Sequence, residues 1–302
     1  MAAELVQYDD PLDPRGWVLE PTRRRLALAF PDLEWTVRPA GMVESWEDYD
    51  GAEVEGGRAG MAAACARMSE QYGMPIDEYL WFDDPPTSSW PACRAIAAAG
   101  LQAAGDGDAV DGPEAAARLL RACREATFAR RASLSDPARL REVVEAVPGV
   151  DSDALWAAVG DGRADDAFDA AREDAAGEDA PGVERAAGRC ALPTLVVRDG
   201  GEALGVSGIG DFEDYTDAVT TVTGRAPRES TPDVGAVLDR FSPEGWLARV
   251  ELAHLTGQPV EDTEAAAAAL VEAGDVVEET FAAEPWWRLA EYEPTAASED
   301  DT

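Results

Sequence analysis

The sequence contains no lysine, a single histidine and only four cysteines in 302 residues. The cysteines, at positions 65, 93, 123 and 190, are widely spaced, so no Cys-x-x-Cys motif or Cys/His cluster is present. With His254 as the single imidazole, we expect no zinc or other metal site and no cofactor. Cys65, Cys93 and Cys123 each lie in an alanine-rich helical pattern, where a free cysteine commonly serves as a small buried apolar residue.

Long apolar runs are also missing. No stretch of 18 apolar residues occurs, and the start at residues 1–4 lacks the basic flank and apolar segment of a signal peptide. The sequence therefore predicts neither a membrane span nor secretion, and indicates a cytoplasmic protein.

The charge is strongly one-sided. Asp and Glu number 61 against 25 basic residues, all of them arginine, which gives a formal net charge of -36. Such a chain repels itself at low ionic strength, whereas salt shortens the Debye length to about 3 Å at 1 M. We therefore expect a protein adapted to a salt-rich cytoplasm such as that of a halophilic archaeon. Disorder is the competing interpretation of an acidic chain, but 46% apolar residues and nine tryptophans provide for a core.

Apolar periodicity predicts an alternation of strands and helices. Residues 5–8 and 33–37 have the pattern of strands, and residues 17–30 between them have helical spacing. A long helical region follows, and a β-branched run then leads through Asp199-Gly200-Gly201, a hairpin signal, into a partner strand. The ranges are 59–178 for the helical region, 191–197 and 203–206 for the hairpin strands, and 211–223 for a closing helix.

The run Asp10-Pro11-Leu12-Asp13-Pro14-Arg15-Gly16-Trp17 resembles the active-site loop of DsbA-like proteins in the thioredoxin superfamily. Those proteins often carry Asp-Pro-Leu-Cys-Pro-x-Cys-Trp after the first strand, so Asp13 and Gly16 stand in the positions of the two cysteines. Three further segments match in the expected order: 85–95, 119–137 and Leu192-Pro193-Thr194, which resembles the cis-proline loop. The likeness includes the FrnE and 2-hydroxychromene-2-carboxylate isomerase branches, and it implies a redox fold without its dithiol.

The resemblance and the pattern together predict an α/β protein. Its fold class is a thioredoxin-like fold with an inserted α-helical lobe and a small C-terminal winged-helix-like module. The expected divisions are the first half of the thioredoxin-like domain at 1–58, the helical lobe at 59–185, the second half at 186–223, a linker at 224–235, the module at 236–292 and an acidic tail at 293–302.

The C-terminal module follows an outline of helix, turn, helix and hairpin. Helical segments are expected at 246–255 and 263–273, and short strands at 275–280 and 286–289. Winged helices commonly bind DNA, but the candidate recognition helix carries acidic residues and no arginine, so we do not expect DNA as a partner. Trp286 and Trp287 are expected to pack this module on itself or on the main domain.

Asp13 has two interpretations. An Asp-Pro pair is a favourable helix start, with Asp13 as the N-cap and Pro14 in the first turn. Alternatively, Asp13 and Arg15 form a polar recognition site beside Trp17, in which Gly16 leaves room for a ligand. A carboxylate cannot replace a thiolate in disulfide exchange.

Leu192, Pro193 and Thr194 are the second candidate. In the family that the sequence resembles, the main chain of the residue before the cis-proline pairs with an extended substrate, which is a form of strand addition. The loop could instead serve fold geometry alone. Cys190 lies three residues before Pro193 and is the candidate reactive thiol.

The preferred hypothesis is a peptide-binding or adaptor protein in thiol or protein homeostasis, with an extended peptide or client protein bound at the cis-proline groove. The first alternative is an enzyme, either a single-thiol oxidoreductase that uses Cys190, or a glutathione-transferase-kappa-like or isomerase-like enzyme with a ligand near Asp13, Arg15 and Ser89. A transcription regulator is the third hypothesis. The complete set of candidate binding residues is Asp13, Pro14, Arg15, Gly16, Trp17, Ser89, Leu192, Pro193 and Thr194.

Overall fold

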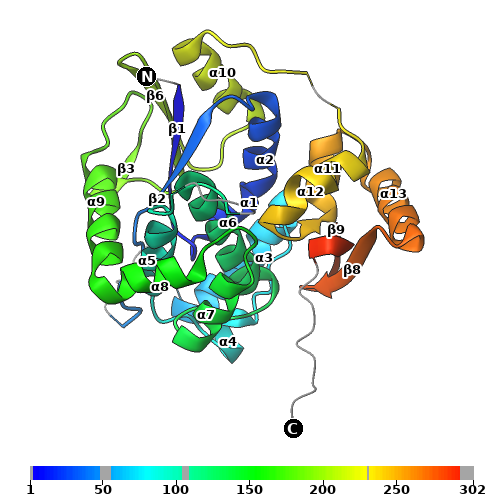
Figure 1. The fold of residues 1–302 in the computed structure, drawn as a ribbon, viewed down its shortest axis with the longest axis horizontal. Helices are drawn as coiled ribbons and strands as arrows, with labels where there is room; N and C mark the ends of the chain where they lie inside the picture. Colours follow the sequence, from blue (N-terminus) through cyan, green and yellow to red (C-terminus); the bar gives the residue numbers. More distant parts are fainter. Residues whose placement is uncertain (1–2, 48–55, 104–108, 230, 293–302) are drawn as a thin grey trace.

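A four-stranded mixed sheet forms the centre of the structure (Figure 1). The computed structural model describes residues 3–47, 56–103, 109–229 and 231–292. The strand order is β2 (Glu34–Pro39), β1 (Glu4–Asp9), β5 (Thr194–Asp199) and β6 (Glu202–Ser207), in which β1 runs parallel to β2 and antiparallel to β5. The four strands expected from the sequence are therefore present, with their ends shifted by a few residues.

Side-chain alternation along β1 distributes apolar residues to both faces of the sheet. Leu5 packs with Leu195 and Val219 under α2 (Glu20–Ala29) and α10 (Phe212–Thr223). Val6 and Tyr8 point to the other face, where Ala175 of α9 (Arg163–Gly177) joins their cluster. The central strands are thus covered by helices on both sides.

The helix expected at 17–30 consists of two helices. A short α1 (Pro14–Val18) is followed by α2, with Leu19 between them. Pro21 lies in the first turn of α2 and has no N–H to donate to the carbonyl of residue 17, which favours a break in the helix at this point.

Helices form the insert between β2 and β5, as the sequence predicts. Several begin at an aspartate cap: Asp111, Asp136 and Asp151 each accept a hydrogen bond from a main-chain N–H of the first turn. The elements are α3 (Gly57–Tyr72), α4 (Leu80–Asp83), α5 (Trp90–Ala99), α6 (Gly112–Arg124), the π-helical turn η2 (Glu125–Ala129), α7 (Pro137–Glu145), α8 (Ser152–Asp161), α9, and the small hairpin of β3 (Arg185–Ala186) and β4 (Arg189–Cys190).

A C-terminal unit of helices and a three-stranded sheet lies beside α2 and the insert (Figure 1). It has its own apolar core, which includes Phe241, Leu252 and Trp287. Its first helix begins at residue 234, inside the expected linker. The elements are α11 (Val234–Phe241), the 3-10 turn η3 (Ser242–Glu244), β7 (Leu247–Ala248), α12 (Arg249–Thr256), α13 (Val260–Ala273), β8 (Val276–Phe281) and β9 (Glu284–Leu289), with sheet order β7-β9-β8 and a last 3-10 turn η4 (Ala290–Tyr292).

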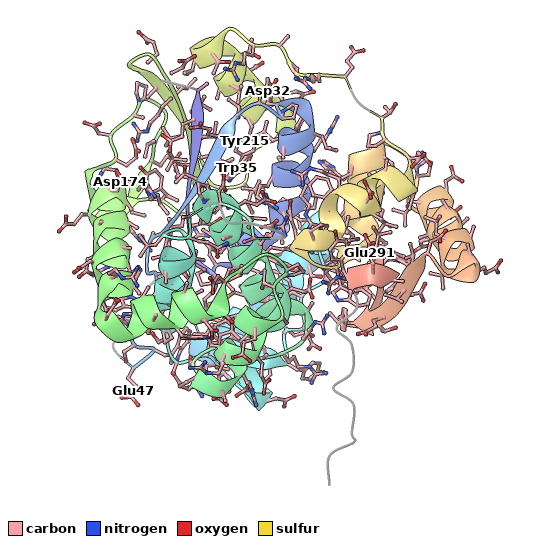
Figure 2. The ribbon with its side chains drawn as sticks, in the orientation of Figure 1. Asp32, Trp35, Glu47, Asp174, Tyr215 and Glu291 are labelled. Carbon is pink, nitrogen blue, oxygen red and sulfur yellow. The ribbon has the colours of Figure 1, made fainter. Side chains whose placement is uncertain are left out.

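Charged side chains cover the outside of the fold (Figure 2). Asp32, Glu47 and Asp174 belong to different parts of the main domain, and Glu291 belongs to the C-terminal unit. The helices in the described part of the chain include no candidate for a transmembrane span.

Candidate functional site

The loop after β1 is held in place by Asp10. One carboxylate oxygen accepts a hydrogen bond from the Leu12 N–H at 2.8 Å, and the other accepts from the Ser89 hydroxyl at 2.8 Å and from the Met42 N–H. Asp10 is fully buried, and this burial raises the pKa of its carboxyl group, although the hydrogen bonds act in the opposite direction. Ser89, a candidate site residue, thus fixes the loop through Asp10.

Asp13 caps α1. Its Oδ1 accepts hydrogen bonds from the main-chain N–H and the Nε of Arg15, both at 3.0 Å, and Pro14 occupies the first turn. The helix-start interpretation of Asp13 is therefore confirmed. Its side chain is 1% exposed, and its Oδ2 is buried without a hydrogen-bond partner among the residues that the structure describes. Burial raises the pKa of this carboxyl group, while the adjacent Arg15 guanidinium lowers it.

Gly16 does not leave free space. A Cβ placed on this residue would collide with the guanidinium of Arg124 and with the Asp9 carboxylate. Arg124 is itself fully buried and forms an ion pair with Asp9. The expectation that Gly16 makes room for a ligand is therefore wrong, because Arg124 fills the position where a second cysteine side chain would lie.

Arg124 belongs to a buried ion cluster that lies behind the loop. The Arg124 Nη1 contacts Glu20 at 2.8 Å, and Arg121 contacts Glu251 at 2.9 Å. Arg24 also contacts Glu251 at 2.8 Å, and Arg23 joins Glu20 to Glu244. The buried ion cluster comprises Asp9, Glu20, Arg23, Arg24, Arg121, Arg124, Glu244 and Glu251, which are four acids and four arginines.

The cluster connects three parts of the fold: the sheet and α2, the insert helix α6, and the C-terminal unit. Burial by itself would raise the pKa of Glu20, but the charges of Arg23, Arg124 and Arg121 outweigh it and lower the pKa to about 2. Glu20 is therefore ionised at neutral pH. Ions this deeply buried are retained only where partners compensate their desolvation, so the three parts are held together by matched charges.

The Leu192-Pro193 peptide bond is cis, as the resemblance implied. Thr194 lies beside it and donates its hydroxyl to the Ala191 carbonyl, and the Pro193 carbonyl accepts from the Gly208 N–H at 2.7 Å. Leu192 is 2% exposed and packs in the cluster around Cys190 and Val196. The loop that could pair with an extended peptide is thus buried in this structure.

Trp17 is also closed off from solvent. It is fully buried, donates its indole N–H to the Pro75 carbonyl at 2.9 Å, and packs against Phe128. Trp286 from β9 stacks on it, with ring centroids 5.9 Å apart and planes inclined by 23°. The hairpin of the C-terminal unit therefore packs on the face that carries the altered loop, in line with the expected packing role of Trp286.

We compared the sequence with protein-family models and with curated proteins. No protein-family model matches the chain. Among curated proteins, it is 33% identical over 138 residues to the ClpXP adapter protein SpxH of Halalkalibacterium halodurans, a stretch that covers 44% of this chain and 41% of that protein. The alignment thus spans less than half the length of this relative.

Two crystal structures give the fold. A putative protein disulfide isomerase from Nitrosomonas europaea superposes with a TM-score of 0.56 at 15% identity, covering 73% of this chain and 97% of that one. A probable DsbA oxidoreductase from Streptomyces coelicolor gives a TM-score of 0.51 at 19% identity, with coverages of 76% and 94%. The chain has the DsbA-like thioredoxin fold. Its helical insert is part of that fold, as the sequence predicts.

The chain has no exposed thiol among its cysteines. All four are free and buried, and burial raises the pKa of both Cys65 and Cys190 to about 11 and that of Cys123 to about 12. Burial likewise raises the pKa of Cys93, whose Sγ lies 3.5 Å from an Asp10 oxygen. Cys190 packs under the cis-proline loop as an apolar side chain.

We expect all four thiols to resist alkylation by iodoacetamide in the folded protein at neutral pH. Alkylation needs the thiolate, and raising a thiol pKa by two units lowers the thiolate fraction roughly a hundredfold, before the loss of access is considered. Mass spectrometry of samples labelled with and without denaturant measures this directly. The labelling rate should increase with pH towards 11. Rapid labelling of Cys190 at neutral pH in folded protein would contradict the assignment.

Sequence reasoning missed the buried ion cluster. The available signal was the placement of Arg121 and Arg124 on a helix whose neighbours Leu119, Leu120 and Cys123 are buried. An arginine at an apolar helical position indicates a buried partner of opposite charge. Its partners are far away in sequence, so the pairing itself was not predictable from spacing.

Proposed function

We propose that this protein is an adaptor that binds another protein and performs no thiol-disulfide chemistry. The observation that carries the proposal is the altered loop: Asp13 caps a helix where one cysteine would lie, and Arg124 fills the space beside Gly16 where the other would lie. The likeness to SpxH supports it, since that protein is named as a ClpXP adapter. We infer the corresponding role here, presentation of a client protein to an energy-dependent protease in the cytoplasm.

The place of client binding is part of the proposal. The cis-proline loop, Leu192 to Thr194, remains our candidate groove for an extended peptide or client protein, and the loop from Asp13 to Trp17 remains a second candidate binding segment. Strand addition needs main-chain groups that a partner can reach. Because Leu192 and Trp17 are buried, binding there requires movement that uncovers them.

Two finer assignments accompany the proposal. We place the chain in the FrnE and 2-hydroxychromene-2-carboxylate isomerase branch, on the resemblance of its loop. We also assign the C-terminal unit as winged-helix-like, on its element order and the strand order β7-β9-β8. DNA is not the partner that its charge favours, since Arg249 is paired with Glu264 and Glu284 and α13 carries no basic residue.

No specific observation supports either enzyme hypothesis. The single-thiol oxidoreductase needs a reactive Cys190, which is buried with a raised pKa. The isomerase or transferase needs a ligand near Asp13, Arg15 and Ser89. In the structure the Ser89 hydroxyl is bound to Asp10, and the Asp13 carboxylate is bound to Arg15.

Complementation with a cysteine-free chain tests the proposal. Cys65, Cys93, Cys123 and Cys190 are all changed to alanine, and protein half-lives are measured by pulse labelling and mass spectrometry in cells lacking the native chain. We expect a defined set of proteins to be degraded more slowly in those cells, and both the native and the cysteine-free chain to restore their degradation.

Two results would contradict the adaptor. Unchanged half-lives in cells lacking the chain exclude a role in client degradation. Failure of a folded cysteine-free chain to restore degradation, together with changed thiol oxidation states of the client proteins, favours the single-thiol enzyme. Thermal unfolding of the cysteine-free chain in multimolar potassium chloride establishes that it is folded.

A further inference from the structure

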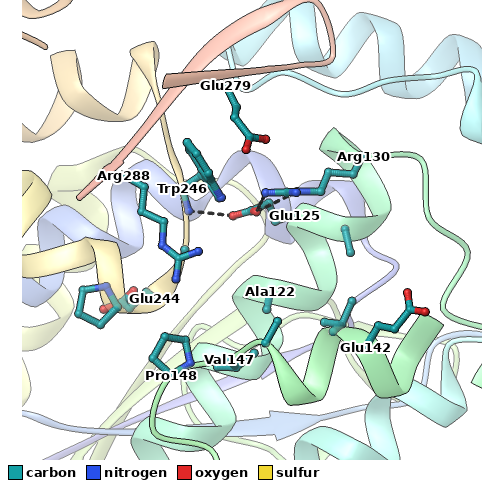
Figure 3. A pocket seen from close by; sticks show the side chains of 15 residues that line it. Ala122, Glu125, Arg130, Glu142, Val147, Pro148, Glu244, Trp246, Glu279 and Arg288 are labelled. Carbon is teal, nitrogen blue, oxygen red and sulfur yellow. Dashed lines mark hydrogen bonds and ion pairs between the residues drawn. The ribbon is translucent and has the colours of Figure 1, made fainter. Parts of the chain in front are cut away.

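A cavity of about 260 Å³ lies between the helical insert and the C-terminal unit (Figure 3). The insert contributes the wall formed by α6, η2, α7 and the turn after α7, including Ala122, Ala126 and Val147. The C-terminal unit contributes the turn from Pro243 to Trp246 and the strands β8 and β9. The cavity is separate from the loop that carries Asp13 and from the cis-proline loop.

Arg288 of β9 is the unusual residue of this cavity. It is 6% exposed, yet within the described ranges no carboxylate lies within ion-pair distance of its guanidinium and no acceptor bonds to it. Its Nε is buried without a partner. In Figure 3 the side chain is directed into the space between Trp246 and Pro148. Burial lowers the pKa of Arg288, whereas the Glu125 charge acts in the opposite direction. The guanidinium also lies over the Tyr292 ring, 5.9 Å from its centroid.

The carboxylates that line the cavity either already have hydrogen-bond or ion-pair partners, or are exposed to solvent. Glu125 accepts hydrogen bonds from Arg130 at 3.0 Å and from the Trp246 N–H at 2.9 Å. Glu244 forms an ion pair with Arg23 at 2.6 Å. Glu142 and Glu279 are exposed, so water screens their charges. Among the described residues, Arg288 is therefore a buried cation of the lining that no carboxylate contacts directly, whereas Arg130 is paired with Glu125.

The turn from Pro243 to Trp246 passes close to Glu125 because residue 245 is glycine. Gly245 has a φ of 137°, and a Cβ there would lie 2.7 Å from Glu125. Only glycine allows the main chain to pass close enough for Trp246 to bond with Glu125. The remaining wall is apolar, with alanine, valine and proline side chains around the Trp246 ring.

We propose that this cavity binds a small ligand with a carboxylate on an apolar body, and that Arg288 pairs with the carboxylate. A guanidinium matches a carboxylate in a bidentate geometry, and the apolar wall accepts the body. The carboxylate belongs either to a free organic acid or to the C-terminus of a peptide. This site goes beyond the adaptor role and does not depend on it.

Calorimetric titration in multimolar potassium chloride tests the site with matched probes. Phenylacetate is compared with phenylacetamide, and a short peptide that ends in phenylalanine is compared with its C-terminal amide. We expect at least one acid to bind ~10-fold or more tightly than its amide, because charge-assisted hydrogen bonds are about twice as strong as neutral ones. The tighter of the two acids identifies the source of the carboxylate.

Arg288→Gln and Arg288→Met should both abolish the preference for the acid. Arg141→Gln is the control, because Arg141 lies on the adjacent α7, pairs with Glu145 and does not line the cavity. Equal binding of each acid and its amide, no binding of any probe, or an acid preference that persists in both Arg288 variants would overturn the proposal. Thermal unfolding of the same variants serves as a second readout, since a bound acid should raise the Tm of the native chain only.

Discussion

Glu251→Gln is expected to lower the free energy of unfolding by about 3–5 kcal/mol, the cost typical of breaking a buried ion pair by removing one partner. The Glu251 carboxylate is fully buried between Arg24 and Arg121, with contacts of 2.8 and 2.9 Å. It also accepts the Ala248 N–H at 3.0 Å. Glutamine keeps the shape of the side chain but removes the nearest counter-charge of two buried arginines, which leaves Arg24 with Glu244 at 3.6 Å and Arg121 with Glu20 at 3.9 Å. Urea unfolding in multimolar potassium chloride measures the effect.

The matched control is Glu261→Gln on α13. Glu261 is exposed, and the same loss of one negative charge there should change the free energy of unfolding by less than about 0.5 kcal/mol. The buried effect should also persist as the salt concentration is raised, because buried pairs are screened far less than exposed ones. A cost for Glu251→Gln as small as that of the control would show that the cluster does not stabilise the docked C-terminal unit.

The excess of acidic residues and the buried ion cluster lie in different parts of the molecule. The excess of acidic residues lies on the surface, where dissolved salt moderates repulsion. The cluster contains as many acids as arginines, so its formal charges cancel. Arginine is suited to this interior role because its planar guanidinium binds several oxygens at once, as Arg121 does with Glu251 and the Trp246 carbonyl.

The fold was largely predictable from local signals. The strands around residues 5–8 and 191–197 have apolar patterns of period two or continuous β-branched runs, and Asp13-Pro14 marks a helix start by its own chemistry. Such signals depend on neighbours in sequence. Pro21 also indicated the break at Leu19. The helical spacing of the apolar residues in 17–30 nevertheless predicted one continuous helix.

The site was less predictable because its determinants are contacts between distant segments. Glu20 meets Arg124 across 104 residues, and Arg24 meets Glu251 across 227. No spacing rule encodes either pair. The environment of Gly16 depends on α6, so the sequence suggested an empty position where the structure has a guanidinium. The absence of a hydrogen-bond partner for the Arg288 Nε among the described residues likewise becomes visible only once all its neighbours are placed.

Restoring the two cysteines is expected not to restore a redox enzyme. In the double variant Asp13→Cys with Gly16→Cys, the second side chain would enter the space held by Arg124 and Asp9. Arg124 cannot move aside without leaving its partners, because it is fully buried and paired with Asp9 and Glu20. Overpacking a buried site costs about 1–3 kcal/mol, and a disturbed buried ion pair adds to this. We expect a chain of lower stability with no turnover of a model disulfide protein.

Two single variants test whether a Cβ at position 16 is enough to lower the stability. Gly16→Ala adds only the Cβ and should lower the free energy of unfolding by at least about 1 kcal/mol, although alanine favours a helix by about that amount. Gly160→Ala in α8 is the control, since a Cβ there meets no atom within 4 Å and should leave stability unchanged or higher. Gly16→Ala as stable as the native chain, or disulfide turnover by the double variant, would show that Arg124 yields its place and that the dithiol chemistry was lost through the cysteines alone.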